Sequence, residues 1–194
     1  MNLPNRITTG RLALTLALFV VLVLIEEQVL ARHFGGMIAF VLFVSATASD
    51  WIDGYLARRL GQVTVFGRIM DPFVDKLVIC GTLIFIIPMT PVLESWMVAV
   101  IVSREFFVNA IRGFAESRGI SFAAEMPGKI KMVLQSFAIG SIIFQVGVGD
   151  PYTGDPMWVD VLAKVLVWAA VISTLYSGYL YARKAAASFR GATY

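Results

Sequence analysis

The sequence of 194 residues is 58% hydrophobic and only 15% charged, whereas a soluble domain carries about 25% charged residues. This composition excludes an ordinary soluble protein, and a net charge of +3 is too small to favour a nucleic-acid partner. Cys80 is the only cysteine, which excludes an internal disulfide framework. We therefore expect one membrane-embedded domain over residues 1–194.

Six apolar segments are long enough to cross a bilayer, which takes about 20 mostly apolar residues per helix. They lie near residues 8–28, 36–58, 68–87, 94–116, 130–149 and 157–182, and glycine or proline separates them. We expect the first to be a retained span rather than a signal peptide, because Glu26 and Glu27 follow it in place of a small-residue cleavage site. The pattern predicts an all-α integral membrane protein with six transmembrane helices.

The basic residues are unevenly distributed along these segments. If both termini face the cytoplasm, all but Arg32 and Lys164 of the 16 Lys and Arg residues fall on the cytoplasmic side. Cytoplasmic loops of membrane proteins carry an excess of Lys and Arg, so we expect this orientation. Residues 1–11 mix polar and apolar side chains and contain Pro4, which predicts a short N-terminal segment lying at the cytoplasmic interface.

Four aspartates lie in DWIDGYLARRLGQVTVFGRIMDPFVDK, residues 50–76, between the second and third spans. At 100° per residue Asp50 and Asp53 share one helix face, and Asp71 and Asp75 share another. The short connection predicts antiparallel neighbouring helices, so that the four carboxylates converge at their cytoplasmic ends. Pro72 leaves two starts open for the third helix: at Pro72 itself, or near residue 65 with a kink at Pro72.

The four aspartates need compensation, since two like charges about 4 Å apart repel by about 4 kcal/mol at an effective dielectric near 20. Oxygen ligands without nearby Cys or His favour a hard cation, Mg²⁺ or Mn²⁺. Four carboxylates suit two ions, an arrangement used in phosphoryl transfer. The alternative is a set of solvated helix ends paired with arginines, which explains four aspartates at helical spacing near the bilayer boundary less well.

The same segment resembles the signature of the CDP-alcohol phosphatidyltransferase family, a spaced pattern of Asp, Asp-Gly, Ala-Arg, Gly, Asp and Asp. The matching residues, with every spacing kept, are Asp50, Asp53, Gly54, Ala57, Arg58, Gly67, Asp71 and Asp75. The resemblance implies the six-helix fold of that family and a homodimer in the bacterial cytoplasmic membrane with a cytoplasmic active site. It also implies transfer of a phosphatidyl group from a CDP-lipid, with release of CMP, in phospholipid biosynthesis.

The resemblance implies a role for each matching residue. Two divalent metal ions would be held by Asp50, Asp53, Asp71 and Asp75. Asp75 would also be the general base that takes the proton of the acceptor hydroxyl. Contacts with the CDP-lipid are implied for Asn5, Thr8, Gly54, Ala57, Arg58 and Thr64. Gly54 has an alternative role in close helix packing.

A basic set on the fourth and fifth spans suggests an acceptor that carries a phosphate. Arg104 and Arg112 lie near one helix face, and Lys129 and Lys131 open the fifth helix, where the helix dipole also favours an anion. The alternatives are an Arg104 that pairs with the neighbouring Glu105, and lysines that bind lipid headgroups.

Within the family, residues 103–120, the following PGKIKM and the opening NLPNRITTGR resemble members that use sn-glycerol 3-phosphate as acceptor and CDP-diacylglycerol as donor. Arg118 is a weaker candidate for the acceptor phosphate. The last 60 residues fit a generic sixth helix.

Three alternatives remain open. The first is another acceptor in the same family, such as inositol phosphate, serine or a second phosphatidylglycerol; the basic set disfavours the last two. The second is an intramembrane prenyltransferase, which leaves the Asp-Gly, Ala-Arg and Gly frame unexplained. The third is a transporter or passive bundle, which would distribute polar residues at mid-depth rather than gather charge at one face.

Overall fold

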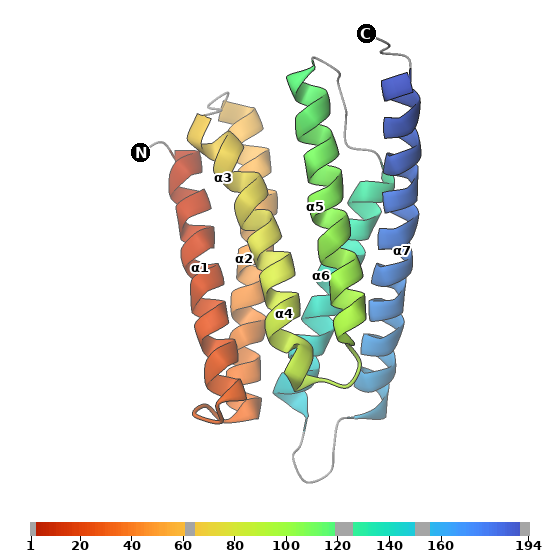
Figure 1. Ribbon diagram of the computed structural model, residues 1–194. Coiled ribbons are helices and arrows are strands. Elements are labelled where there is room, and N and C mark those ends of the chain that lie inside the picture. The colour runs from red at the N-terminus through yellow and green to blue at the C-terminus, as the bar shows by residue number, and fades with distance from the viewer. Residues whose placement is uncertain (1–2, 61–64, 119–125, 150–155, 191–194) are drawn as a thin grey trace.

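The computed structural model describes residues 3–60, 65–118, 126–149 and 156–190, and within them the side chains of residues 7–49, 67, 70–118, 126–149 and 156–187. Every regular element in the described ranges is a helix (Figure 1). The elements are α1 (Leu3–Glu26), α2 (Arg32–Leu60), α3 (Val65–Lys76), the π-helix η1 (Leu77–Gly81), α4 (Thr82–Ile86), the 3₁₀ helix η2 (Ile87–Met89), α5 (Ser95–Ser117), α6 (Met126–Val148) and α7 (Met157–Arg190).

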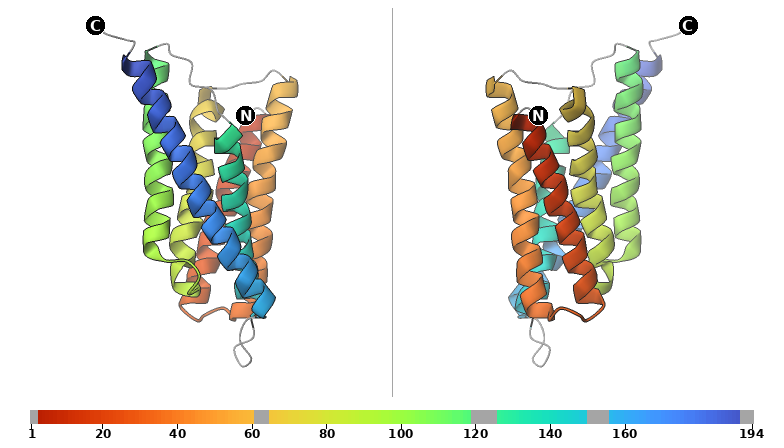
Figure 2. Two further views of the ribbon diagram at one scale, coloured as in Figure 1. Left: turned by 90° about the vertical axis from the view of Figure 1, so that its right-hand side faces the viewer. Right: turned by 90° about the vertical axis from the view of Figure 1, so that its left-hand side faces the viewer.

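The helices form an up-and-down bundle in which α3, η1, α4 and η2 follow one another as a single rod (Figures 1 and 2). α1 packs against α2, α2 packs against α6, and α6 packs against α7. α1 also contacts α3 and α4, and α5 packs against α7. Consequently α1 begins and α7 ends at the same end of the bundle, as an even number of spans requires (Figure 2).

The expected all-α membrane fold is confirmed. Five segments are long and apolar enough to cross a bilayer: residues 7–26, 32–49, 70–89, 126–148 and 157–187. They correspond to five of the six predicted spans. α5 corresponds to the remaining predicted span, residues 94–116, and lies alongside the others. Its 23 residues carry two arginines and two glutamates, which lower its apolar character.

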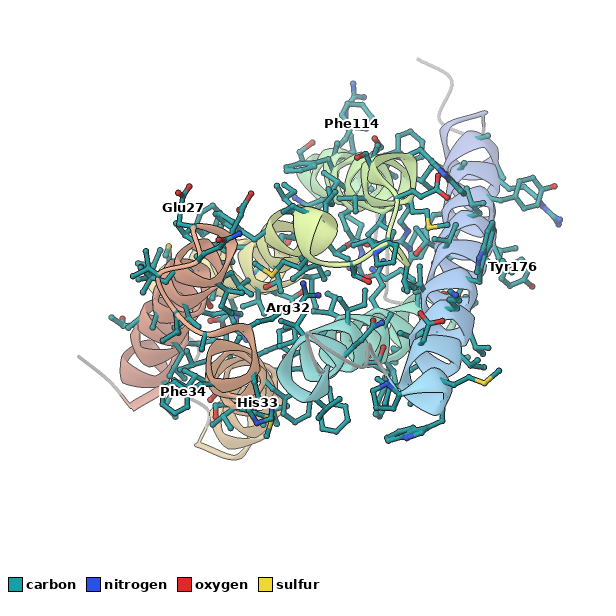
Figure 3. All side chains as sticks on the ribbon, turned by 90° about the horizontal axis from the view of Figure 1, so that it is seen from below. Glu27, Arg32, His33, Phe34, Phe114 and Tyr176 are labelled. Carbon is teal, nitrogen blue, oxygen red and sulfur yellow. The ribbon has the colours of Figure 1, made fainter. Side chains whose placement is uncertain are left out.

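The bundle buries one face of each central helix and leaves apolar side chains outside. On α6 the buried residues Ala138, Ile139, Ile142, Ile143 and Val146 follow helical periodicity. In contrast, Phe114 on α5 and Tyr176 on α7 point away from the bundle (Figure 3) and are 50% and 60% exposed. Apolar side chains thus lie both inside the bundle and on its outer face, and an apolar outer face suits contact with lipid.

The rod formed by α3, η1, α4 and η2 begins at Val65. Pro72 therefore lies inside α3 rather than at its start. This decides between the two starts that the sequence left open. Proline lacks the backbone N–H that would continue the helical ladder. The π turn η1 begins directly after Lys76, and such turns occur often at functional sites.

The N-terminal residues, predicted as a short segment at the interface, belong to the first helix of the bundle. From Leu3 onward these residues are the first turns of α1, which continues without interruption to Glu26. Thr8 and Arg11 are each only 2% exposed. Both find polar partners on Asp71 of α3, and this gives the segment a reason to join the bundle instead of lying on its surface.

α2 and α6 cross at two glycines. A Cβ added at Gly36 would lie 2.5 Å from the backbone nitrogen of Gly147, which is closer than any side chain allows. Small residues at such crossings let helix backbones approach in membranes, where packing replaces the hydrophobic effect as the driving force. The crossing fixes the first turns of α2 against the last turns of α6, at the end of the bundle opposite the start of α3 (Figure 1).

Gly36→Ala is therefore expected to lower the free energy of unfolding by about 1–3 kcal/mol, because the backbones must separate to admit the methyl group. The matched control is Gly113→Ala on α5, where an added Cβ meets nothing within 4 Å and alanine favours the helix. Thermal unfolding of the two variants in detergent checks this. Equal midpoints would contradict the close packing at Gly36.

Candidate active site

α3 places Asp71 and Asp75 one turn apart, as their four-residue spacing predicted. Asp71 is exposed and Asp75 is half-buried. The C-terminal turns of α2, which contain Asp50, Asp53, Gly54, Ala57 and Arg58, end at the same end of the bundle at which α3 begins, and α2 and α3 run in opposite directions (Figure 1).

Several of the predicted site residues lie outside the description of the structure. Thr64 lies outside the described residues. The described side chains also leave out those of Asn5, Asp50, Asp53, Ala57 and Arg58, and the surroundings of Gly54. Among the described side chains no three carboxylates, thiols or imidazoles gather as metal ligands. Asp71 and Asp75 supply hard oxygen donors, and this donor chemistry fits Mg²⁺ or Mn²⁺.

Two hydrogen bonds from side chains of α1 hold Asp71 in place. The Thr8 hydroxyl Oγ1 donates to Asp71 Oδ1 at 2.7 Å, and Arg11 Nη2 donates to the Asp71 backbone carbonyl oxygen at 3.0 Å. One bond fixes the carboxylate and the other fixes the backbone that carries it. Thr8, for which the resemblance implied a contact with the CDP-lipid, thus donates a hydrogen bond to an aspartate of the motif.

A cavity of about 180 Å³ opens beside Asp75, between α3, η1, α5, α6 and α7. Its polar and charged lining residues are Asp75, Lys76, Arg104, Glu105, Arg112, Lys129, Lys131, Gln135 and Tyr181. All four residues that the sequence proposed for an acceptor phosphate are in this set. The structure therefore joins Asp75, the last aspartate of the motif, to the basic set in one space. Arg118 does not line the cavity and instead lies over the Phe114 ring, 5.2 Å from its centroid.

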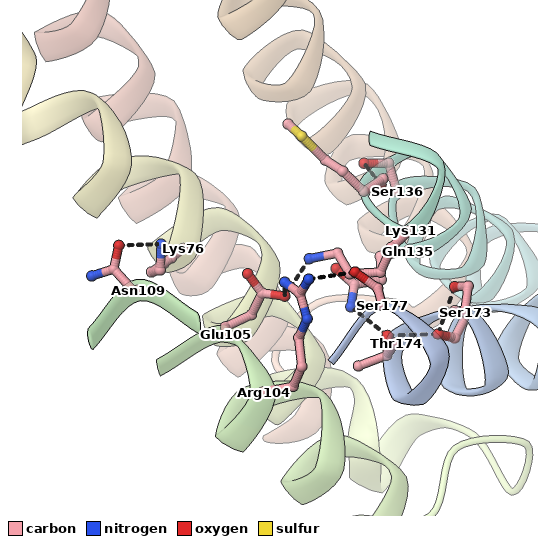
Figure 4. A network of polar contacts seen from close by, with 12 residues as sticks. Lys76, Arg104, Glu105, Asn109, Lys131, Gln135, Ser136, Ser173, Thr174 and Ser177 are labelled. Carbon is pink, nitrogen blue, oxygen red and sulfur yellow. Dashed lines mark hydrogen bonds and ion pairs between the residues drawn. The ribbon is translucent and has the colours of Figure 1, made fainter. Parts of the chain in front are cut away.

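Glu105 is the centre of the charge network in this cavity (Figure 4). Its Oε1 atom accepts from Arg104 Nη1 at 3.2 Å and also from the Lys131 ammonium. The side chains of Arg104, Glu105 and Lys131 are only 11%, 13% and 6% exposed. The sequence alternative in which Arg104 pairs with Glu105 thus holds, and the same Arg104 also lines the cavity.

Other polar contacts extend the network to α7 and to the Asp75 side of the cavity. Arg104 Nη2 donates to Ser177 Oγ at 2.5 Å, and Gln135 Nε2 donates to Thr174 Oγ1 at 3.0 Å. Lys76 Nζ, next to Asp75, donates to Asn109 Oδ1 at 3.3 Å. Gln135, Thr174 and Ser177 thus take part in hydrogen bonds between helices.

Sequence reasoning missed the contribution of α7 to the cavity. Tyr181 is 3% exposed, and the Cζ atoms of Arg104 and Arg112 lie 5.4 Å and 5.9 Å from its ring centroid. Ser177 and Tyr181 are four residues apart, so they share the helix face toward α5. The four-residue spacing of these two polar residues was the signal in the sequence that could have revealed this face. It was missed because the surrounding residues of α7 are mostly apolar, as in an ordinary membrane span.

Comparison with known proteins gives one family. The model of the CDP-alcohol phosphatidyltransferase family matches residues 1–176. A CDP-diacylglycerol–glycerol-3-phosphate 3-phosphatidyltransferase of Bacillus subtilis is 35% identical over 94% of this chain and 94% of its own. One of Rickettsia felis is 32% identical over 93% of each chain. A probable phosphatidylglycerophosphate synthase of Mycobacterium tuberculosis is 31% identical over 95% of this chain and 81% of its own.

Proposed function

The chain belongs to the CDP-alcohol phosphatidyltransferase family, and on that premise we propose that it transfers the phosphatidyl group of CDP-diacylglycerol to sn-glycerol 3-phosphate. CMP is released and phosphatidylglycerophosphate is formed, a step of phospholipid biosynthesis. Family membership removes the prenyltransferase and the passive bundle as alternatives. The names of the relatives favour glycerol 3-phosphate over the other acceptors.

The observation that carries the proposal is the cavity that joins Asp75 to Arg104, Arg112, Lys129 and Lys131. An acceptor whose phosphate lies among these cations can place its hydroxyl beside Asp75. Binding the phosphate at a distance from the reacting oxygen orients the acceptor and lowers the entropic cost of reaction. Neither serine nor glycerol carries a phosphate that would use these four cations.

The proposed reaction is a displacement at the phosphorus that carries the lipid. The Asp75 carboxylate takes the proton of the acceptor hydroxyl, the oxygen forms a bond to that phosphorus, and the bond to the CMP oxygen breaks. The diacylglycerol part stays in the bilayer throughout. The four cations hold the acceptor phosphate, and Arg58, with Asn5, Thr8, Gly54, Ala57 and Thr64, would contact the CDP part of the donor.

Two ions of Mg²⁺ or Mn²⁺ complete the proposal, with Asp50, Asp53, Asp71 and Asp75 as their ligands. When bound, they would neutralise the diphosphate of the donor and stabilise the leaving CMP. Asp71 and Asp75 have the donor chemistry for this role. Thr8 and Arg11 hold Asp71 in place, as partners of ligand carboxylates commonly do in metal sites.

We further propose that the end of the bundle where α1 begins and α7 ends faces the cytoplasm of a bacterial cell. All but two of the 16 Lys and Arg residues belong to this side in the predicted topology. A water-soluble acceptor would then reach the cavity from the cytoplasm while the donor lipid enters from the membrane. The family resemblance also supports a homodimer.

The first prediction of the proposal concerns the acceptor. Purified protein with CDP-diacylglycerol and Mg²⁺ should release CMP with glycerol 3-phosphate, and not with serine, glycerol or inositol phosphate. Asp75→Asn should lower kcat by about 10²–10⁴-fold, since the variant cannot accept the proton. The control Asp160→Asn changes a carboxylate that pairs with Lys164 on α7 and should keep full activity. Release with another acceptor alone would contradict the assignment of the basic set.

The second prediction concerns Thr8. Thr8→Val removes the hydroxyl that holds Asp71 while keeping the shape, and loss of a group that hydrogen-bonds a metal ligand weakens metal binding about 10–100-fold. Titration of Mn²⁺ followed by electron paramagnetic resonance should therefore give a weaker apparent affinity, and Thr8→Ser should restore it.

The matched control for this prediction is Thr15→Val. Thr15 is as deeply buried on the same helix, but its hydroxyl donates to the backbone oxygen of Arg11. Its Mn²⁺ affinity should match that of the unaltered protein. If Thr8→Val binds Mn²⁺ as tightly as this control does, the bond to Asp71 does not support a metal site.

A further inference from the structure

The cavity holds cations close to one another before any acceptor is present. Arg104, Arg112 and Lys131 all line it, whereas Glu105 is in contact with only two of them, Arg104 and Lys131. Like charges repel, and the repulsion grows where water is scarce. The contacts of Glu105 therefore do not account for the position of Arg112 at the wall of the cavity.

Tyr181 of α7 lies against both arginines. The Cζ atoms of Arg104 and Arg112 are 5.4 Å and 5.9 Å from the centroid of the same ring. The ring is 3% exposed, so it cannot turn freely toward solvent. The π-face of an aromatic ring attracts a cation within about 6 Å, and arginine is the usual partner. One ring thus lies within cation–π distance of two guanidinium groups.

The turn of α7 that precedes Tyr181 also lies close to Arg104. Ser177 Oγ accepts from Arg104 Nη2 at 2.5 Å, and a Cβ added at Gly178 would lie 3.1 Å from Arg104 Cγ. Ser177, Gly178 and Tyr181 therefore form a surface that fits the length of the arginine side chain. This surface restricts Arg104 to the arrangement in which its guanidinium faces the cavity.

We propose that Tyr181 is a positioning residue for acceptor binding: its ring holds Arg104 and Arg112 together so that the acceptor phosphate meets two arginines already in place. The inference rests on the proposed function, in which these arginines bind the acceptor phosphate. Because the guanidinium groups are placed before binding, the phosphate does not have to order them, and preorganisation of this kind raises affinity. Tyr181 itself needs no contact with the substrate.

The test compares Tyr181→Leu with Tyr181→Phe. Leucine removes the aromatic face, whereas phenylalanine keeps the ring and removes only the hydroxyl. Tyr181→Leu should raise the KM for glycerol 3-phosphate about tenfold and leave kcat and the KM for CDP-diacylglycerol within about twofold. Inhibition by inorganic phosphate, which shares only the anion with the acceptor, should weaken by a similar factor. Tyr181→Phe should behave as the unaltered protein in all four measurements.

Three results would overturn the inference. An unchanged KM for glycerol 3-phosphate in Tyr181→Leu would show that the ring does not matter. An equal loss in Tyr181→Phe would assign the effect to the hydroxyl. A parallel change in kcat, both KM values and the thermal midpoint would indicate a merely structural residue.

A second pair of variants keeps the test decisive if Tyr181→Leu does not fold. Ser177→Ala should raise the KM for glycerol 3-phosphate about threefold with kcat unchanged, and Ser177→Thr should restore the KM. An unchanged KM in Ser177→Ala would count against the positioning of Arg104 by α7.

Failure of the proposed function is distinct, since the unaltered protein would then release no CMP with glycerol 3-phosphate. An active unaltered protein whose KM does not respond to Tyr181→Leu overturns the inference alone.

Discussion

The contact of Glu105 with Arg104 and Lys131 is the interaction on which the site depends. Three charged side chains with little exposure meet at one carboxylate oxygen. Removing one partner of a buried ion pair costs about 3–5 kcal/mol, because the remaining charge stays without compensation. Glu105 thus allows the bundle to keep cations inside while α5 packs against its neighbours, and the cavity beside Asp75 retains a positive wall.

The two halves of the site are held by helices that the aspartate motif does not include. Thr8 and Arg11 of α1 fix Asp71 on one side, and Ser177 and Tyr181 of α7 fix Arg104 on the other. Between them α3, which ends with Asp75 and Lys76, continues directly into the π turn η1. The first and last helices thereby connect both termini of the domain to the proposed chemistry.

Much of the fold followed from the sequence, because apolar length and helical spacing are local properties. The boundaries of the apolar segments predicted the helices closely, and the four-residue spacing placed Asp71 and Asp75 one turn apart. The N-terminal segment was predicted from its mixed polar and apolar residues to lie at the interface, but the burial of Thr8 and Arg11 against Asp71 was not predicted. Local composition cannot reveal a partner that lies 63 residues away.

The sequence by itself determined the membrane class, the helical segments and the aspartate pattern, since each depends on residue type and on spacing within a few turns. Only the tertiary structure decided that α7 belongs to the cavity. Arg104 and Ser177 are separated by 73 residues, and no spacing rule relates side chains on different helices. Which face of α7 meets α5 depends on how all the helices pack, and that packing alone brought Tyr181 against the two arginines.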